Sequence, residues 1–572
     1  MSLGAALHDV VIVGAGHNGL VAANYLARAG KRVLVLEARD VVGGACTTEE
    51  LIPGSRWSSC AFVCGLLRPE IVRDLELKRF GLELYQGESL AFSLFRDGSY
   101  MFIWKELDRT LKELERYSRC DAENYLKFGV RLRRFAELIR PWLLRPPPTR
   151  SEVMAEFERA GEQDLFDEFV LLSTRDLLDR YFESEHIKGF LTFFGMVSIW
   201  GGPSTPGTSY TYGHHSWGEF EGQFGQFGLV RGGMGGITEA LAAAARSFGV
   251  EIRLGAPVAS VQVGGGRVAG VVLEDGEEIA AEAVISNADP QRSLLSLLEP
   301  DDLDPEFRAS VEGIDMRGSM ARIHLLIDEL PAYLPFAGAA SGPQHQGHQM
   351  LGASLENFER AWEAQRRGAF PDQYVIEAVI QSVTDPALAP PGQHTLTLGV
   401  QQLPSQLAGT TWDAEKEEWA DRVVEDLCGY APNLADHILD RRVITPQDLE
   451  RDYFLTGGNI FQGAMFLDQL FDSRPLTELS SYRTPVGGYY LCGAGTHPGG
   501  GVMGASGHNA AGVVLSDLDG PSGATNGRRQ RKRTGGLVDR AMTTEAGRRL
   551  GYSLARRKAF RPIARLMARE RK

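Results

Sequence analysis

The first apolar and polar positions of the chain predict a strand, a helix and a second strand in close succession. An apolar run from Val10 leads into the turn GAGHNG at residues 14–19, and a helical period follows to about Arg28. A second apolar run, Val33 to Leu36, ends on the acidic residue Glu37. This order of strand, glycine turn, helix, strand and acid is typical of a domain that binds an adenine dinucleotide.

Each glycine of this turn has a physical role in such a domain. Gly14 allows the tight turn, Gly16 lets the backbone approach a pyrophosphate, and Gly19 lets the helix pack closely on the strand. The helix N-terminus offers free N–H groups to the phosphates. The carboxylate of Glu37 suits a pair of ribose hydroxyls and would repel a 2′-phosphate. The motif alone leaves NAD and FAD open.

The pattern then changes several times along the chain. Short strands, with a hairpin over Asp97-Gly98, are expected at 75–107, and helical blocks at 107–144 and 151–200. A glycine-rich turn at 232–236 opens a helix at 237–248, and three alternating segments predict an antiparallel meander at 258–263, 268–273 and 278–285. Later strands are expected at 322–327, 374–380 and 394–400, a helix at 412–428, and a strand, glycine-rich turn and small-residue helix at 488–518.

These pieces predict an α/β fold in which a discontinuous, Rossmann-like FAD-binding domain carries an inserted mixed α+β substrate domain. A nucleotide domain that is interrupted twice suits a long cofactor lying extended across the fold, which favours FAD over NAD. The predicted FAD-binding domain comprises 8–75, 225–300 and 485–520, and the substrate domain 76–224 and 301–484. The turn at 499–504 would bring backbone and a helix N-terminus to the flavin ring.

Composition and charge narrow the range of partners. The chain has 572 residues, which favours two packed domains, and a net charge of −14. Residues 521–572 hold 16 Lys and Arg but only 3 Asp and Glu, so the rest of the chain is strongly acidic and nucleic-acid recognition by it is not expected. The basic tail is expected to be disordered or to form an interfacial helix in peripheral contact with anionic lipid. No apolar run reaches eighteen residues, and the few residues before Asp9 leave no room for a leader peptide. We therefore expect a cytoplasmic protein that is at most peripheral on the inner membrane face.

The cysteines and aromatic residues each leave two interpretations open. The six cysteines form no CxxC pair, so no metal site is expected; Cys60 and Cys64 are either buried thiols, which is favoured, or a redox dithiol. The bulky residues of 151–200 either pack a core or line a tunnel for an apolar substrate.

Three segments resemble the carotenoid/retinoid oxidoreductases, the phytoene desaturase-like branch of the FAD-dependent flavin amine oxidase superfamily. They are VVIVGAGHNGLVAANYLARAG…VLVLEARDVVGGA, RGGMGGITEAL…VASVQV…VISNADP and LCGAGTHPGGGVMGASGHNAAG. On GGACTTEE, LLRPEIVRDLELKRFGL, TGGNIFQGAMFLDQL and GGGVMGASGHNAA, the chain is similar to the pyridine nucleotide-disulfide oxidoreductase domain-containing protein 2 group within that branch. Members of this group are described as probable oxidoreductases, the animal ones being assigned a regulatory role in mitochondria.

The resemblance implies a set of FAD contacts. Gly14, Gly16 and Gly19 would face the pyrophosphate, Glu37 the adenosine ribose, and Gly43 and Gly44 the region near the ribityl chain. Val258 would offer backbone to the adenine, and the segment from Gly495 to Ala505, with Gly500, Gly501, Val502 and Met503, would border the flavin. Ala45 stands where many flavin amine oxidases have Arg, so any contact of that Arg must be absent or replaced.

The expected reaction is hydride transfer from an apolar, isoprenoid- or polyene-like small molecule to flavin, with an undetermined electron acceptor. Oxidation of an amine, or a flavin-binding regulatory protein with little turnover, are the alternatives. Candidates for a general base are His497, His508 and the His214-His215 pair, each balanced by a purely structural role. Asn459 and Gln462 either contact the substrate or pack within their loop.

Overall fold

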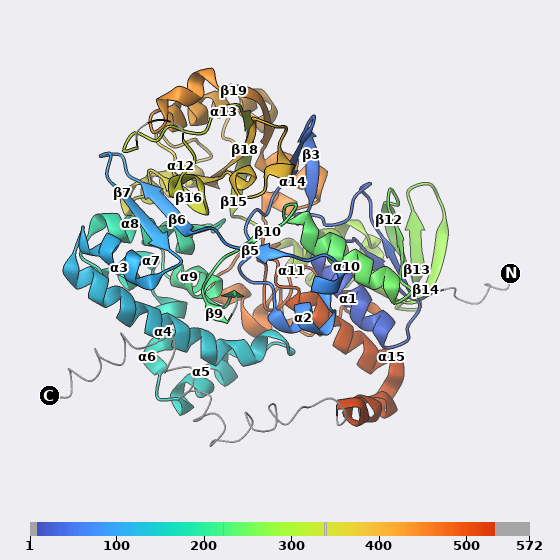
Figure 1. The fold of residues 1–572 in the computed structure, drawn as a ribbon. Coiled ribbons are helices and arrows are strands. Elements are labelled where there is room, and N and C mark those ends of the chain that lie inside the picture. Colours follow the sequence, from blue (N-terminus) through green and yellow to red (C-terminus); the bar gives the residue numbers. More distant parts are fainter. Residues whose placement is uncertain (1–7, 221, 337, 339, 532–572) are drawn as a thin grey trace. The chain divides into compact units, whose positions relative to one another are not determined.

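The computed structural model describes residues 8–220, 222–336, 338 and 340–531, with side chains as far as residue 520. The chain divides into two compact units, Met1–Ala511 and Gly512–Lys572. The first unit contains two seven-stranded sheets and the helices packed on them (Figure 1). In the described part of the chain, no helix has the length and apolar character needed to cross a membrane.

The first sheet has the order β11-β2-β1-β14-β13-β12, with β20 also paired to β14. Neighbours are parallel from β11 through β2, β1 and β14 to β20. Strands β1 and β2 and the last four residues of β14 are buried almost throughout, as expected of parallel strands covered on both faces. Their bounds are β1 His8–Val13, β2 Val33–Leu36, β11 Glu251–Arg253, β14 Glu278–Ser286 and β20 Tyr489–Leu491.

Two helices stand beside this sheet and pack on each other. They are α1 (His17–Arg28) and α10 (Gly235–Ser247), and the Asn24 side chain of α1 donates to the Leu241 carbonyl of α10 at 2.9 Å. Strands β12 (Val258–Gly264), β13 (Arg267–Leu273) and β14 form the antiparallel meander that the sequence predicts.

The second sheet has the order β19-β15-β18-β17-β16-β6-β7, and only β16 and β6 pair in parallel. The predicted hairpin over Asp97-Gly98 and the three predicted later strands are confirmed, whereas β16 and β19 were not predicted. The bounds are β6 Ser89–Leu94, β7 Tyr100–Trp104, β15 Ser319–Ile327, β16 His348–Leu351, β17 Ile376–Val379, β18 His394–Leu403 and β19 Ile438–Ile444.

Strands of the first sheet all come from the three segments predicted to bind FAD, and strands of the second from the two predicted substrate segments. The predicted α/β fold class is therefore correct, while the exact domain boundaries stay a prediction. Alternate residues of the second sheet pack on α13 (Trp412–Cys428) in one apolar cluster, and the opposite face carries buried polar side chains.

The predicted helical blocks are divided into shorter helices. Ser118 interrupts the first, because its hydroxyl accepts the Asp121 N–H at 3.1 Å and starts a new helix. Most bulky residues of 151–200 are buried in one core, where for example Phe135 and Phe169 stack at 5.0 Å, so the core interpretation is correct for them. The helices are α3 Leu107–Glu115, α4 Arg119–Leu143, α5 Arg150–Arg159, α6 Gln163–Phe166, α7 Thr174–Asp179, α8 Glu185–Met196 and α9 Ser209–His215.

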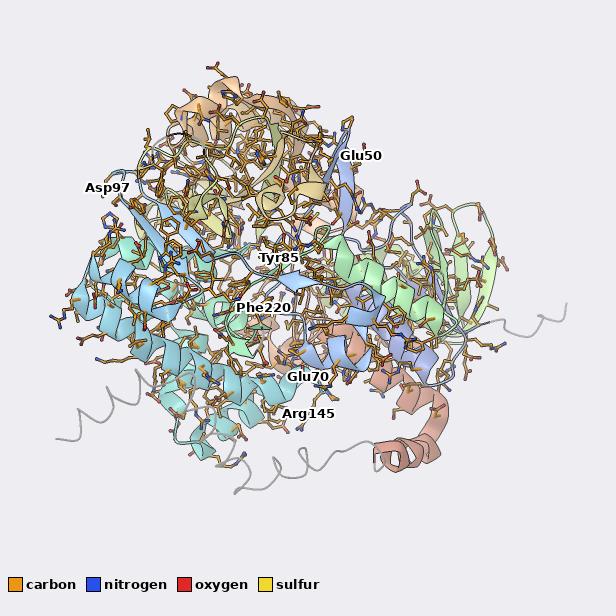
Figure 2. The ribbon with its side chains drawn as sticks, viewed as in Figure 1. Glu50, Glu70, Tyr85, Asp97, Arg145 and Phe220 are labelled. Atoms are coloured by element: carbon orange, nitrogen blue, oxygen red, sulfur yellow. The ribbon has the colours of Figure 1, made fainter. Side chains whose placement is uncertain are left out.

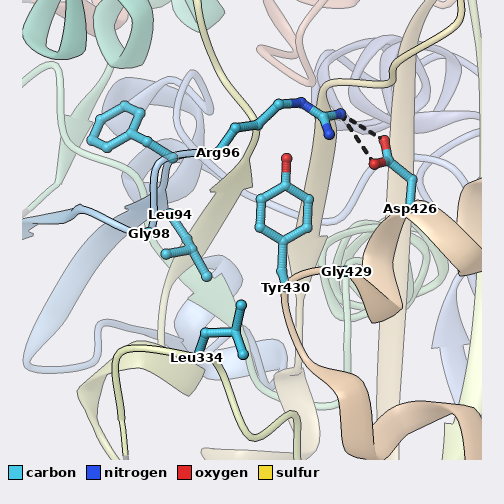
Figure 3. A pocket seen from close by; sticks show the side chains of 8 residues that line it. Leu94, Arg96, Gly98, Leu334, Asp426, Gly429 and Tyr430 are labelled. Atoms are coloured by element: carbon cyan, nitrogen blue, oxygen red, sulfur yellow. Dashed lines mark hydrogen bonds and ion pairs between the residues drawn. The ribbon is translucent and has the colours of Figure 1, made fainter.

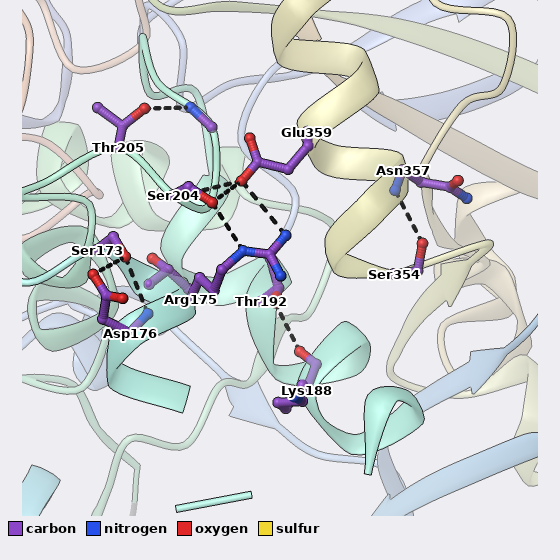
Figure 4. Close-up of polar contacts among 12 residues, drawn as sticks. Ser173, Arg175, Asp176, Lys188, Thr192, Ser204, Thr205, Ser354, Asn357 and Glu359 are labelled. Atoms are coloured by element: carbon purple, nitrogen blue, oxygen red, sulfur yellow. Dashed lines mark hydrogen bonds and ion pairs between the residues drawn. The ribbon is translucent and has the colours of Figure 1, made fainter. Parts of the chain in front are cut away.

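Polar contacts join this helical block to α12 (Leu355–Arg366), as Figure 4 shows. Glu359 of α12 accepts the Ser204 N–H at 2.8 Å and lies 3.6 Å from the guanidinium of Arg175. Ser173 and Ser354 cap α7 and α12 by accepting backbone N–H groups three residues on, each at 3.0 Å. These caps fix where the two helices begin.

The remaining elements are short connections, apart from the C-terminal helix. A helical turn at Leu77–Phe80 stands where only strands were predicted. The last helix, α15 (Ala505–Arg531), is interrupted at Gly520, close to its predicted end. Beyond it, residues 532–572 of the predicted basic tail lie outside the described residues, so its lipid contact stays a prediction. The other elements are β3 Thr48–Ile52, β4 Ser55–Ser58, β5 Leu84–Tyr85, β8 Glu219–Phe220, β9 Gln223–Phe224, β10 Leu229–Val230, α2 Pro69–Asp74, α11 Pro305–Glu312 and α14 Pro446–Tyr453.

Candidate functional site

The predicted glycine turn connects β1 to α1. Gly14 has a positive φ of 96°, and a Cβ on Gly19 would lie 2.3 Å from the Gly14 carbonyl oxygen. A Cβ on Gly16 would lie 2.5 Å from the side-chain Nδ2 of Asn287. Gly16 begins α1 without a side-chain cap, and the first turn holds no acidic residue. The N–H groups of this helix end are therefore left for an anion.

Glu37 lies at the end of β2, directly beside this turn. Its carboxylate accepts the Ala15 N–H at 2.7 Å and the Arg39 N–H at 3.0 Å. Burial raises the pKa of Glu37 despite these hydrogen bonds. Each oxygen keeps further acceptor capacity, which is the chemistry that a pair of ribose hydroxyls requires.

Two more predicted contacts lie next to these. Gly43 pairs with Gly16 in an isolated parallel bridge, and a Cβ on Gly44 would lie 3.6 Å from the Gly16 Cα. Val258 stands two residues after Ala256, whose N–H donates to the Glu37 carbonyl at 2.8 Å. The fold thus gathers the glycine turn, the glycine pair, the acid and the start of β12 in one region.

Asn287 joins the N-terminal and C-terminal motifs, and the sequence analysis did not single it out. Its side chain lies against Gly14, Gly16 and Gly19, and the Cys492 thiol contacts its Oδ1 at 3.7 Å. Its position as a small polar residue directly after a buried parallel strand is the signal that could have identified it.

The C-terminal loop from Gly495 to Ala505 follows β20 and packs against segments from both halves of the chain. A Cβ on Gly495 would lie 2.6 Å from Pro290 Cδ. The Met503 carbonyl accepts the Arg68 N–H at 3.1 Å. The buried Arg68 guanidinium also donates to the Trp217 carbonyl and pairs at 3.2 Å with Glu70, which is labelled in Figure 2.

Apolar side chains cover the centre of this loop. A Cβ on Gly499 would lie 3.1 Å from Met465 Cε, one on Gly500 would lie 2.6 Å from Phe461 Cδ1, and one on Gly501 would lie 2.4 Å from Leu66 Cδ1. Val502 has a positive φ of 58°, which is uncommon for a branched residue.

The nominated histidines occupy different surroundings. The His497 Nε2 bonds the Trp142 carbonyl at 3.0 Å, and burial lowers the pKa of His497 to about 4. His508 packs on Tyr25 of α1 and contacts Asn509. His214 reaches the loop from α9, since its Nε2 bonds the Gly500 carbonyl at 3.0 Å, while its buried Nδ1 has no partner among the described residues. Burial also lowers the pKa of His214 well below its ordinary value.

The two further substrate candidates are held by the loops around them. Asn459 donates to the Arg317 carbonyl at 2.8 Å and accepts the Phe461 N–H at 2.8 Å. Gln462 accepts the Gly495 N–H at 3.2 Å. Both side chains therefore make the packing contacts that were the alternative to a substrate role.

The cysteines form no disulfide. All six are free, and burial raises the pKa values of Cys60 and Cys64 to about 12. These thiols are protonated at neutral pH, which argues against a redox dithiol. A separate pocket of about 110 Å³ lies at the ion pair between Arg96 and Asp426, beside Tyr430 (Figure 3), and none of the predicted site residues lines it.

The family described as flavin containing amine oxidoreductase matches residues 19–515. The chain belongs to this family. Pyridine nucleotide-disulfide oxidoreductase domain-containing protein 2 of Mus musculus is 38% identical to this chain over 545 residues. The match covers 89% of this chain and 94% of the relative. Phytoene desaturase (lycopene-forming) of Pseudescherichia vulneris is 27% identical to this chain, and the match covers 90% of this chain and 100% of the relative. Among solved structures, cyclohexylamine oxidase from Brevibacterium oxydans IH-35A has a TM-score of 0.54 at 18% identity. The match covers 90% of this chain and 100% of the oxidase, so the two proteins share the fold.

The predicted family, the FAD cofactor and the general class of oxidoreductase are therefore confirmed. The uncapped start of α1, the buried carboxylate of Glu37 and the side-chain-free backbone at Gly16 fit FAD. The assignment of individual residues to parts of FAD stays a prediction. When bound, the flavin supplies an acceptor for a hydride and its two electrons.

Proposed function

We propose that this flavoprotein removes a hydride from an apolar small molecule of the isoprenoid or polyene class. The observation that carries the proposal is the apolar cover of the predicted flavin loop by Leu66, Phe461 and Met465. Such surroundings exclude water and favour a hydrocarbon next to the site of hydride transfer. The similarity to phytoene desaturase supports the same substrate class.

Half-buried aromatic rings extend this apolar region. Phe194 and Phe227 stack with ring centres 5.8 Å apart, and Phe194 also packs on Tyr212. Phe461 packs against both His214 and His215. We propose that these rings form one wall of the substrate site. The predicted tunnel for an apolar substrate would then be lined by the half-buried rings, whereas the fully buried residues of 151–200 pack the core.

Amine oxidation is the second candidate, because the family description names amine oxidoreductases and the fold is shared with cyclohexylamine oxidase. Aromatic rings also form the cages that bind amines. A flavin-binding regulatory protein with little turnover is the third. The proposal includes a cytoplasmic location, or a peripheral one on the inner membrane face, and leaves the electron acceptor open.

Anaerobic mixing of the purified, FAD-loaded protein with candidate substrates tests these functions. Loss of the oxidised flavin absorbance with isoprenoids or polyenes, and not with primary amines, is the expected result. Reduction by amines alone would replace the first function with the second. No reduction by either class, with a protein partner retained, would favour the regulatory role.

A further inference from the structure

A buried charged cluster lies on the face of the second sheet opposite α13. It consists of Arg322 on β15, His348 on β16 and Glu377 on β17, with side chains only 6%, 7% and 5% exposed. The neighbouring positions of the same strands, such as Ile323 and Ile376, belong to the apolar core. Apolar residues would pack this face as well, and buried ions require compensation, so packing does not explain the cluster.

Glu377 is the centre of this cluster. One carboxylate oxygen accepts from Nε2 of His348, and the other accepts from Nη1 of Arg322 and from the Gln401 amide, each at 3.2 Å. Burial opposes the ionisation of Glu377, but His348 and Arg322 outweigh it and hold the pKa of Glu377 below its ordinary value. The carboxylate therefore stays ionised at neutral pH, and both of its oxygens are used.

The hydrogen bond to Glu377 determines which nitrogen of His348 is free. Since Nε2–H donates to the carboxylate, Nδ1 of the neutral ring carries the lone pair. Among the described residues, Nδ1 of His348 has no hydrogen-bond partner. His324 on β15 differs, because its two nitrogens bond the Thr397 hydroxyl at 3.1 Å and the Ser59 carbonyl at 3.3 Å.

The surroundings of His348 connect it to the apolar region beside the predicted flavin loop. Its ring packs edge-on against Phe193 at 5.2 Å and Phe62 at 5.7 Å. His215 lies close enough that His348 and Glu377 both act on its pKa, which burial lowers. His215 packs in turn against His214, whose Nε2 bonds the Gly500 carbonyl.

We infer that His348 accepts the proton that leaves the substrate, and that Glu377 is a positioning residue that orients its ring and stabilises the imidazolium. This inference rests on the proposed function. A hydride leaves one substrate carbon for the flavin, the proton on the adjacent carbon passes to His348 Nδ1, and the remaining electron pair forms the carbon–carbon double bond. The imidazolium then returns the proton to solvent.

This role predicts that Glu377 affects the rate of proton transfer and not the binding of substrate. Glu377 and Arg322 are the charged partners of His348 in the cluster. Glu377→Gln removes the anion that stabilises the imidazolium, so the rate of flavin reduction at saturating substrate should fall about 10-fold or more while the substrate affinity stays unchanged.

Stopped-flow reduction of FAD by the substrate identified for the wild type tests the proton transfer. His348→Gln retains an N–H donor for Glu377 and should lower the reduction rate by about 10²–10⁴-fold without a change in substrate affinity or FAD content. Added imidazole should restore part of the rate in His348→Ala. His345→Gln is the matched control, since the two nitrogens of this buried histidine bond the Gly342 N–H and the Pro331 carbonyl. Equal reduction rates in wild type and His348→Gln would overturn the inference and leave the proposed function standing.

A chemical measurement decides the inference even if no substrate is found and the proposed function fails. Diethylpyrocarbonate reacts with a neutral imidazole nitrogen, and mass spectrometry locates the product. We expect His348 to react faster than His345, and its reaction at a fixed pH to become slower in Glu377→Gln, because the carboxylate that holds Nε2–H and orients the ring is gone. Absence of reaction at His348, or an unchanged rate of reaction in Glu377→Gln, would show that Nδ1 is closed or that Glu377 does not control it.

Discussion

Gly19 of α1 packs closely against the glycine turn that follows β1. A Cβ there would meet the Gly14 carbonyl oxygen at 2.3 Å and the Asn287 Cβ at 3.3 Å, and the first of these is backbone that has little room to move. Gly19→Ala should therefore lower the free energy of unfolding by about 1–3 kcal/mol and reduce the bound FAD per protein. Thermal unfolding and the flavin-to-protein absorbance ratio measure both effects.

Gly129→Ala provides the control for this prediction. Gly129 lies inside α4, and a Cβ there has no neighbouring atom within 4 Å. This substitution should leave FAD content unchanged and stabilise the helix by up to about 1 kcal/mol. If Gly19→Ala retained full FAD and stability like the control, close packing at the glycine turn would not be the requirement.

Glu37 makes two opposite contributions with and without cofactor. Its pKa is raised by burial, so in the apoprotein its contribution to stability is present below its unfolded pKa and is lost as pH rises through the folded pKa. Ribose hydroxyls would donate to the anion and reverse this effect. Glu37→Gln should thus weaken FAD binding about 10–100-fold at pH 7. Because the glutamine amide has one acceptor oxygen for the N–H groups of Ala15 and Arg39, it should also lower the stability of the apoprotein by about 1–3 kcal/mol.

Fluorescence titration of apoprotein with FAD, and apoprotein unfolding at pH 4 and 7, measure these two effects. Asp40→Asn is a useful control, since Asp40 is an exposed carboxyl three residues away. Unchanged FAD affinity in Glu37→Gln would remove Glu37 from the ribose site.

At the scale of elements, Arg474 joins the 461–469 segment to the loop that follows β20. Its buried guanidinium donates to the carbonyls of Phe461, Ala464, Gln469 and Ala494 at 2.8–3.3 Å. Burial lowers its pKa to about 10, so it remains charged at neutral pH. Arg474→Lys cannot make all four hydrogen bonds, and each one lost should lower stability by about 1.5–3 kcal/mol.

The same variant should also loosen the predicted flavin loop, which faster limited proteolysis near Gly499 would report. Arg441→Lys is the control, because Arg441 forms its ion pairs with Asp421 and Glu417 nearer the surface. Its effect should stay below about 1 kcal/mol. Equal stability of the two variants would show that the carbonyl contacts of Arg474 do not hold the loop.

Elements with a strong local pattern could be predicted from the sequence, and elements set by distant contacts could not. The turn at Gly14, the meander from Val258 and the hairpin at Asp97 follow from glycine placement and alternation, and all three are present. Strand β16 is only four residues long and pairs with β6, more than 250 residues earlier, so no local pattern marks it. The pairing of His348 with Glu377 depends on the register of β16 against β17, which also follows no local pattern, and it was therefore missed.

At the scale of the whole molecule, neutral histidines buried in both halves of the fold make it sensitive to acid. Burial lowers the pKa of His324 to about 3 and that of His497 to about 4, and also lowers that of His214. Unfolding restores an ordinary pKa near 6.5, so the unfolded chain binds more protons below that value. Stability contributed by these histidines is therefore present above pH 6.5 and is lost as pH falls toward the folded values, by up to about 1.4 kcal/mol per pH unit for each.

His497→Gln isolates one of these protons, because the glutamine amide can still donate to the Trp142 carbonyl. Between pH 6 and 4.5, the free energy of unfolding should fall less steeply in this variant than in wild type, by about 1.4 kcal/mol per pH unit. His437→Gln is the control with the opposite sign: Asp328 raises the pKa of the exposed His437, so its contribution is lost as pH rises. Denaturant unfolding at several pH values measures the slopes, and an unchanged slope in His497→Gln would mean that its ring is already charged in the folded protein.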